Sequence, residues 1–135
     1  MLPPEKEVII AEKAPKALGP YSVGIRIGHL VYTAGQLGID RNTGELVPGG
    51  LQAETRQALL NLQNILEASG SSLQNVVKTT VFLRDMGDFT AMNAIYGEFF
   101  TDKYPARSAV QVAALPKAAA IEIEAVAVVS MPHGD

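Results

Sequence analysis

The guanidinium of Arg107 is the first group in this sequence whose position indicates chemistry. Arg107 stands near the start of ARSAVQVAA, a run of small and branched residues with the composition of a strand. A guanidinium presents a planar fork of N–H donors, which matches a carboxylate in two parallel hydrogen bonds. Because charged side chains at strand ends are usually solvated, a surface charge is the plain alternative to a carboxylate-binding residue here.

Two glutamates in the run IEIEAVAVV are candidates for proton transfer. Glu122 and Glu124 are two residues apart, so a regular strand directs both side chains to the same face. A carboxyl group that is partly buried has a raised pKa. Such a group can take a proton from water and return it to a leaving group. Strand periodicity does not distinguish the two glutamates.

Three further residues stand where they could border a ligand. Tyr21 follows Pro20 in a loop, and Asn93 lies inside a predicted helix but off its apolar face. Gly35, in TAGQ, ends a predicted strand at a point where the backbone could approach a ligand closely. Each has an ordinary explanation as a surface or turn residue, and spacing alone does not connect them with Arg107 or the glutamates.

The familiar catalytic constellations are missing from the sequence. There is no cysteine, and the two histidines, His29 and His133, stand in a turn and near the C-terminus. These give no metal-binding pair and no Ser–His–acid pattern with a G-x-S-x-G turn. Lys78 could form a Schiff base, but a lone strand lysine is usually solvated. The sequence therefore predicts a site without a metal or a cofactor.

Composition restricts the class of protein. The chain has 135 residues, 47% of them hydrophobic, with a formal net charge of −3 and a sequence pI of about 5.3. This length suits a single domain over residues 1–135. The basic residues are scattered singly, unlike a nucleic-acid-binding surface. No apolar run reaches the length of a membrane span, and the start MLPPEKEVII lacks the features of a secretory or transit peptide. We expect a cytoplasmic protein that binds neither nucleic acid nor membrane.

Hydrophobic periodicity predicts the order β-β-β-α-β-α-β-β. A helix starts near Leu51, with Leu59, Leu62, Ile65 and Leu66 on one face, and Gly70 ends it. Asp88 is the expected N-cap of a second helix, whose apolar residues are Met92, Ile95, Tyr96, Phe99 and Phe100. Pro105 prevents that helix from continuing. The expected strands span residues 7–10, 22–28, 29–35, 75–85, 106–114 and 121–129.

Apolar residues are expected on both faces of the resulting sheet. In the fourth strand Val77, Thr79, Val81 and Leu83 share a face, with Val76 and Phe82 opposite. In the last strand Val126 and Val128 share a face with the two glutamates. Strand–helix–strand units place helices over one face and favour parallel neighbours. The other face then needs a cover, and a second copy of the chain supplies one. The pattern predicts a homo-oligomer.

Six segments resemble the successive signature blocks of the RidA family, the reactive intermediate deaminases also called YjgF proteins. They extend from about Ala14 to Val129, in family order: APKALGPYSVGI, YTAGQLGID, NVVKTTVFLRDMGDF, NAIYGEFF, YPARSAVQVAALPK and IEIEAVAV. The resemblance implies an α+β, chorismate-mutase-like fold. In that fold a six-stranded mixed sheet carries two helices on one face. The family forms homotrimers with a ligand cleft at each subunit interface.

The resemblance also implies a reaction, the hydrolysis of 2-imino acids and their enamine tautomers to 2-keto acids and ammonia. Arg107 matches the family arginine that binds the substrate carboxylate, and Glu122 matches the glutamate near the hydrolytic water. Tyr21, Gly35 and Asn93 match residues that shape the cleft, and position 109 offers its backbone N–H. Ala109 stands where many relatives have cysteine, which favours a mechanism without a thiol. Ala34 stands where serine is common.

Three other functions remain open at this stage. A non-catalytic sensor of small carboxylates would need Arg107 but no glutamate near water. RNA cleavage or translation inhibition is attributed to some family members, although the acidic composition and the lack of a histidine pair oppose it. Chorismate mutase activity is suggested by the fold alone, and a fold does not determine a function.

Overall fold

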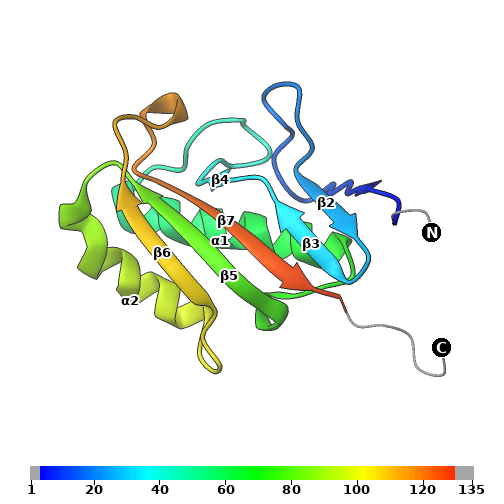
Figure 1. The fold of residues 1–135 in the computed structure, drawn as a ribbon. Coiled ribbons are helices and arrows are strands. Elements are labelled where there is room, and N and C mark those ends of the chain that lie inside the picture. The colour runs from blue at the N-terminus through cyan, green and yellow to red at the C-terminus, as the bar shows by residue number, and fades with distance from the viewer. Residues whose placement is uncertain (1–3, 130–135) are drawn as a thin grey trace.

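The chain folds into a mixed sheet with both helices on one face (Figure 1). The computed structural model describes residues 4–129. The strand order along the sheet is β1-β2-β3-β7-β5-β6, and β4 pairs with β7 beside β3. The strands are β1 (Glu7–Val8), β2 (Gly24–Ile27), β3 (Leu30–Thr33), β4 (Gln36–Leu37), β5 (Val76–Leu83), β6 (Ala106–Gln111) and β7 (Ile121–Val128). The helices are α1 (Gly50–Ala68) and α2 (Phe89–Phe99), and short 3₁₀ turns span Leu73–Asn75, Met86–Asp88 and Pro116–Ala118.

The mixed α+β class is confirmed, and the order of elements is as predicted except for the additional short strand β4 before α1. β5, α2 and β6 form the parallel strand–helix–strand unit. The last strand, β7, lies between β3 and β5 and runs antiparallel to both. This central position places β7, and with it Glu122, between segments that are far apart in the sequence.

The expected strand over residues 29–35 ends at Thr33 as β3, and a bulge separates it from the unpredicted strand β4 at Gln36–Leu37. Tyr32 pairs with Val126, whereas Gln36 pairs with Ile123, so the β3–β4 segment carries one more residue than β7 between these pairs. Such an insertion bends the chain and redirects the side chains that follow. The six predicted strands therefore become seven, with Gly35 at the interruption.

α1 packs the core as its periodicity predicts. Leu59, Leu62, Ile65 and Leu66 are all fully buried. Three of them, all but Ile65, belong to the main hydrophobic cluster with residues of β5 and β7. Gly70 has φ +86°, a conformation in which a glycine commonly terminates a helix.

The start of α2 differs from the expectation. Asp88 occupies the N-cap position, but its side chain makes no capping hydrogen bond. The preceding 3₁₀ turn runs directly into the helix, and Asp85 instead accepts a hydrogen bond from the Gly87 N–H. Of the expected apolar residues, Met92, Ile95 and Tyr96 are buried within the helix, and Phe100 is buried just beyond its end.

The expected alternation along β5 is wrong at its first two residues. Val76 is buried at 5% exposure and Val77 is 47% exposed, the reverse of the prediction. The reason is a register shift between Val76 and Lys78, where β5 gains a residue relative to β7. From Thr79 onward the predicted core face is confirmed, because Thr79, Val81 and Leu83 are buried.

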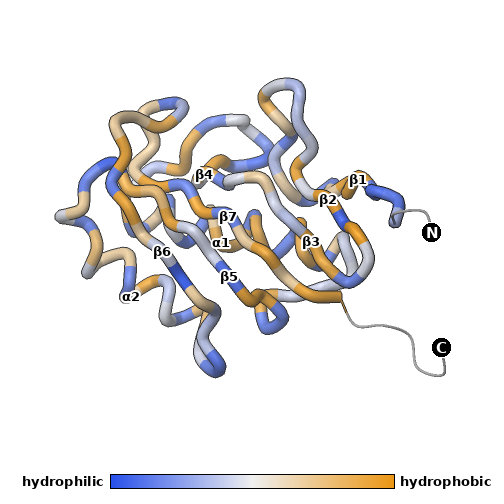
Figure 2. The backbone as a smooth tube through the Cα atoms, viewed as in Figure 1, coloured by the Kyte–Doolittle hydropathy of each residue, from blue (hydrophilic) through white to orange (hydrophobic). Residues whose placement is uncertain are grey.

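Apolar side chains also lie on the sheet face that neither α1 nor α2 covers. Tyr32, Val110 and Val128 are 47%, 43% and 37% exposed, and their register places them on this open face. Figure 2 shows the hydrophobic run at the C-terminal end of β7 beside β3. The prediction of apolar residues on both faces is confirmed, whereas the oligomer that would cover the open face stays a prediction. Over residues 4–129, no helix has the length and apolar character to cross a membrane.

Candidate functional site

A cavity of about 330 Å³ lies between the loop before β2, the β3–β4 bulge and the 3₁₀ turn before β7. These segments meet along the upper edge of the molecule in Figure 1. Three of the residues singled out from the sequence line this cavity, namely Tyr21, Gly35 and Glu122. Its wall is largely apolar and is completed by Pro15, Lys16, Leu18, Val23, Ala34, Gln36, Leu37, Ile39 and Pro116.

Gly35 lies directly against the carboxyl group of Glu122. A Cβ atom on Gly35 would stand 2.7 Å from the Glu122 carboxyl carbon, which is closer than real Cβ contacts allow. At the same bulge, the Ala125 N–H donates to the Thr33 hydroxyl at 3.0 Å. The bulge therefore brings bare backbone over the glutamate, which explains why the position takes glycine.

The structure distinguishes Glu122 from Glu124, which the sequence pattern could not. Both lie on the open face, but only Glu122 lines the cavity. Burial raises the pKa of Glu122, and the nearby charge of Glu124 adds to the rise. A carboxyl group with a raised pKa is suited to exchanging a proton near neutral pH.

Tyr21 is held by its own loop. Its hydroxyl accepts a hydrogen bond from the Leu18 N–H at 3.0 Å, and its backbone N–H donates to the Gly19 carbonyl at 2.9 Å. The tyrosine side chain lines the cavity, while the residue as a whole remains 48% exposed. This loop therefore presents an aromatic wall at the cavity mouth.

Arg107 lies elsewhere, on the helix side of the edge strand β6. Its guanidinium packs over two aromatic rings of α2, 4.8 Å from the Tyr96 centroid and 5.4 Å from that of Phe89. One guanidinium nitrogen, Nη1, donates to the side-chain oxygen of Asn93 at 2.8 Å. The side chain is thus fixed against α2 and is not a freely solvated strand-end charge.

Tyr96, on whose ring the Arg107 guanidinium packs, is itself held by contacts in the core. Its hydroxyl shares a buried 2.8 Å hydrogen bond with Thr79, and its ring packs on that of Phe100. Burial raises the pKa of Tyr96, an effect that Thr79 and Arg107 partly offset. Sequence reasoning assigned Tyr96 to the core alone. The missed signal is that Phe89, Asn93 and Tyr96 lie at i, i+4 and i+7, which is one face of a helix.

The two groups of candidate residues lie on opposite faces of the sheet. Arg107 pairs with Thr79, which is fully buried beneath the helices. Glu122 pairs with Phe82, which in turn pairs with Val110 on the open face. Strand β5 separates Arg107 on β6 from Glu122 on β7. A single chain therefore does not bring Arg107, Asn93 and Ala109 together with Tyr21, Gly35 and Glu122.

The part of the chain that the structure describes holds no candidate metal centre. Within residues 4–129 there is no cluster of three potential metal-ligating acidic, histidine or cysteine side chains. Lys78 donates to the Ser108 hydroxyl at 3.1 Å on the open face, a partly exposed position. His29 stands in the β2–β3 turn, and His133 lies outside the described residues.

Comparison with known proteins places this geometry in a family. The family model described as Endoribonuclease L-PSP matches residues 11–129. The chain belongs to this family. The RidA protein of an Antarctic Psychrobacter species has the same fold, with a TM-score of 0.88 and 44% identity over 91% of this chain and 99% of that one. The RidA resemblance predicted from the sequence motifs is thereby confirmed.

Two sequence relatives cover most of the chain. The mouse protein named 2-iminobutanoate/2-iminopropanoate deaminase is 51% identical over 91% of this chain and 91% of its own length. A RutC family protein of Pyrococcus horikoshii is 53% identical over 90% of this chain and 97% of its own. The family model spans residues 11–129, a range that includes both groups of candidate residues.

Proposed function

We propose that this RidA family member is a hydrolytic deaminase. It converts 2-imino acids and their enamine tautomers, such as 2-aminoacrylate, 2-iminopropanoate and 2-iminobutanoate, to 2-keto acids and ammonia. The relationship to the mouse deaminase, 51% identical over 91% of the chain, carries the proposal. The half-buried Glu122 in a largely apolar cavity supplies the group that this chemistry needs.

The complete site is proposed to form between two copies in a chorismate-mutase-like homotrimer. One copy contributes the cavity with Tyr21, Gly35 and Glu122, and its neighbour contributes Arg107, Asn93 and the Ala109 N–H. Two observations support this: the groups lie on opposite faces of the sheet, and Arg107 lies on an edge strand. The apolar open face provides the surface over which copies would pack.

The groups that the neighbouring copy would contribute can bind a small carboxylate. With Nη1 engaged by Asn93, the remaining guanidinium N–H groups are available for two parallel bonds to a carboxylate. The Val112 N–H donates to β5. Because N–H directions alternate along a strand, the Ala109 N–H three residues earlier points to the unpaired edge. The arginine fork and this N–H would bind one planar 2-imino acid side by side.

Hydrolysis then needs only a positioned water and a proton carrier. As the water oxygen bonds to C2 of the protonated imine, Glu122 takes a proton from it and the C=N electron pair moves to nitrogen. In the resulting carbinolamine, Glu122 returns the proton to nitrogen. The C–N bond breaks and C2 becomes a carbonyl, while the former water hydroxyl gives up its proton to the departing ammonia. Positioning by Arg107 lowers the barrier by holding C2 next to the water.

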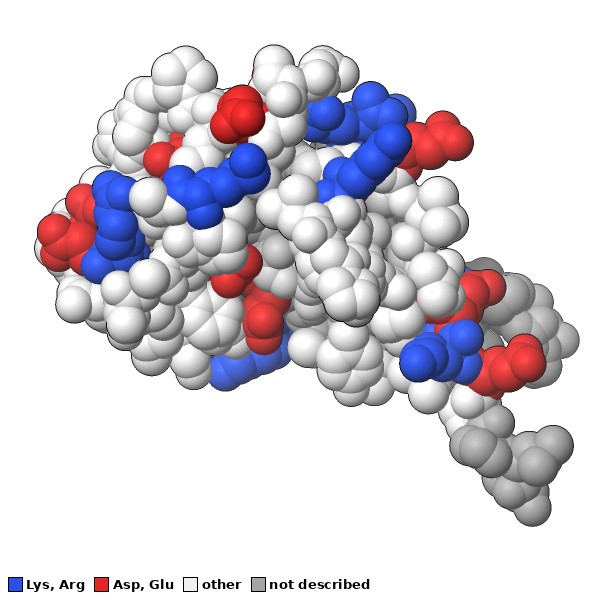
Figure 3. Space-filling model, turned by 90° about the horizontal axis from the view of Figure 1, so that it is seen from above, with Lys and Arg blue, Asp and Glu red and all other residues white. Residues whose placement is uncertain are grey.

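RNA cleavage is the second candidate, because the family's description names an endoribonuclease. The distribution of charge opposes it. On the face in Figure 3, Lys and Arg side chains are interspersed with Asp and Glu. RNA-binding surfaces instead concentrate basic residues. The expected cytoplasmic location, and the absence of nucleic-acid and membrane partners, stay predictions.

The test is keto-acid release from an imine generated in situ by a pyridoxal-phosphate enzyme, with an imine trap present. The wild-type protein should accelerate release, Glu122→Gln should abolish most of the acceleration, and Glu124→Gln should retain it. Binding of a keto acid without acceleration would favour the sensor, and RNase activity that persists through further purification would favour RNA cleavage. If Glu124→Gln proves damaging and Glu122→Gln silent, the assignment of Glu122 is wrong.

A further inference from the structure

Two polar side chains of α1 are buried where the helix meets the cavity wall. Glu54 is 8% exposed and Asn61 is 1% exposed. They are seven residues apart, which is about two helical turns, so they lie on the same face of α1. Glutamate and asparagine are rarely buried to this degree without specific partners, because burial removes their hydrogen bonds to water. Their partners indicate what they do.

Asn61 ties the β4 segment to α1. Its side-chain nitrogen donates to the carbonyls of Leu37 at 3.1 Å and of Ile39 at 3.0 Å. Its side-chain oxygen accepts from Gln57 at 2.9 Å, so the amide is satisfied at both ends. Leu37 and Ile39 line the cavity, and Leu37 is the strand partner of Glu122.

Glu54 holds the chain on the other side of Glu122. Its carboxylate accepts a hydrogen bond from the Ala120 N–H at 2.8 Å, two residues before Glu122. The Ala120 carbonyl in turn accepts from the Arg84 backbone N–H at 3.0 Å, and the Arg84 side chain donates to the Ala118 carbonyl at 2.6 Å. The entry into β7 is therefore fixed from both sides of its backbone.

A glycine, Gly38, allows α1 to approach the β4 segment closely. Gly38 stands between the two carbonyls that Asn61 holds, and a Cβ there would come within 2.5 Å of the Glu54 Cα. Glycine at this position lets the helix backbone touch the β4 segment, which brings both polar side chains within reach of their carbonyl and N–H partners.

We propose that Glu54 and Asn61 are positioning residues for Glu122: from one face of α1 they fix the two backbone segments, 37–39 and 118–120, that flank the catalytic carboxylate. They act through the backbone and touch no substrate. The proposal rests on the assignment of Glu122 in the proposed function. Leucine or methionine at either position would fill the core but leave the Ala120 N–H, or the Leu37 and Ile39 carbonyls, without these hydrogen bonds.

The test compares Glu54→Met with Glu54→Gln in the imine-hydrolysis assay. Methionine removes the acceptor for the Ala120 N–H, so β7 should shift and kcat should fall by about tenfold or more, since small misplacements of catalytic groups have effects of this size. KM should stay within about twofold, because in the proposed site the substrate carboxylate is bound by Arg107 of the neighbouring copy, which Glu54 does not contact. If the shift of β7 lets water reach Glu122, the raised pKa of this carboxyl group should fall towards the ordinary glutamate value. The acid limb of the pH–rate profile should therefore move to lower pH. Glutamine keeps an acceptor oxygen and should restore kcat and the pH profile.

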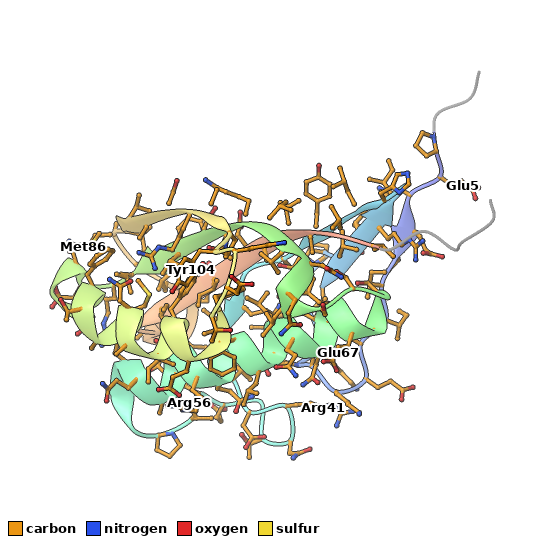
Figure 4. All side chains as sticks on the ribbon, turned by 90° about the horizontal axis from the view of Figure 1, so that it is seen from below. Glu5, Arg41, Arg56, Glu67, Met86 and Tyr104 are labelled. Carbon is orange, nitrogen blue, oxygen red and sulfur yellow. The ribbon has the colours of Figure 1, made fainter. Side chains whose placement is uncertain are left out.

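Glu67→Met is the matched control. Glu67 lies on α1 towards the end far from Arg56, as Figure 4 shows, and its carboxylate accepts a hydrogen bond from the Gln63 side chain of the same helix. Its replacement should change neither kcat nor the pH limb. Circular dichroism and Tm establish that each variant is folded. If Glu54→Met does not fold, Asn61→Ser, which can hold at most one of the two carbonyls, takes its place with the same expected changes.

The outcomes separate this inference from the proposed function. A folded Glu54→Met or Asn61→Ser variant with wild-type kcat and an unmoved pH limb overturns the positioning role while the deaminase stands. The role is equally overturned if Glu54→Gln loses as much activity as Glu54→Met, because the charge and not the acceptor oxygen would then matter. A wild-type protein that does not hydrolyse imines instead removes the proposed function.

Discussion

The Arg107 side chain is preorganised for ligand binding by contacts within its own chain. The stack on Tyr96 and Phe89 and the hydrogen bond to Asn93 hold the guanidinium before any substrate arrives. Each such stack contributes about 0.5–1 kcal/mol at a partly exposed site. Preorganisation of this kind reduces the conformational entropy that carboxylate binding would otherwise cost.

Replacement of Arg107 by lysine separates charge from geometry. Lysine keeps the positive charge but loses the planar fork, and therefore one charge-assisted hydrogen bond worth about 1.5–3 kcal/mol. The value of kcat/KM for imine hydrolysis should fall by roughly ten- to a hundredfold, since 1.4 kcal/mol corresponds to a factor of ten. Arg107→Ala should lose more and should also lower Tm slightly through the lost stacking. Near wild-type turnover in folded Arg107→Ala would contradict the carboxylate-binding role.

The raised pKa of Glu122 has a consequence for stability. Burial disfavours the ionised form, so this carboxyl group favours folding most below its unfolded-state pKa, near 4. That contribution is lost as the pH rises through the higher folded-state pKa. Glu122→Gln, which does not titrate, should therefore have a higher Tm than the wild type at pH 7. The two Tm values should converge as the pH falls below about 4. A lower Tm for the variant at pH 7 would show that ionised Glu122 stabilises the fold.

At the scale of the elements, the β3–β4 bulge sets the geometry of the cavity. It interrupts a strand that would otherwise be regular and places Gly35 against Glu122. The regular elements around it keep the interruption in place, because β4 is paired with β7 on one side and bonded to α1 on the other.

Gly35→Ala tests the contact between the bulge and the glutamate. The added methyl group would meet the Glu122 carboxyl carbon at 2.7 Å, so the carboxylate must move. Because a displacement of this order can cost about a hundredfold in rate, kcat should drop by more than tenfold. Gly44→Ala provides a matched glycine control, as a Cβ there meets nothing within 4 Å and only its positive φ is strained. Turnover by folded Gly35→Ala equal to that of the control would show that the contact is unimportant.

Periodicity predicted the regular elements and failed where a strand is irregular. The four α1 residues predicted to share an apolar face, Leu59, Leu62, Ile65 and Leu66, are all fully buried, because helical spacing determines which side chains share a face. Two irregularities were not predicted: the shift at Val76 and Val77, and the bulge that ends β3 at Thr33 before β4. Alternation assumes one residue per partner, and a bulge adds one. Asp88 illustrates a different limit, because the 3₁₀ turn before α2 runs directly into the helix and the Asp88 side chain makes no capping hydrogen bond.

At the scale of the whole molecule, pairing between distant segments decides where the candidate residues lie. The family resemblance identified Arg107, Glu122, Tyr21, Gly35 and Asn93 by residue. Their division between two faces depends on β7 entering between β3 and β5, which no local pattern reveals. Glu54 and Asn61 were missed for a similar reason, because their partners are backbone atoms of segments distant in the sequence.

The open face predicts the assembly. Light scattering after gel filtration should give three times the 14.3 kDa chain mass. The sheet face with exposed Tyr32, Val110 and Val128 needs a cover, and the RidA resemblance implies that three copies supply it. Tyr32→Lys should weaken the assembly by placing a charge in the contact. A stable monomer that hydrolyses imines at the wild-type rate would contradict both the trimer and the shared site.

The central claim is that Glu122 of one copy acts with Arg107 of another. Subunits carrying Arg107→Ala and subunits carrying Glu122→Gln should each be inactive alone. Unfolded together in equal amounts and refolded, they should regain imine hydrolysis at about one quarter of the wild-type rate, the share of interfaces in a cyclic trimer that combine both intact residues. If the mixed trimers form and no activity returns, Arg107 and Glu122 do not serve one site across an interface, and the proposed arrangement is wrong.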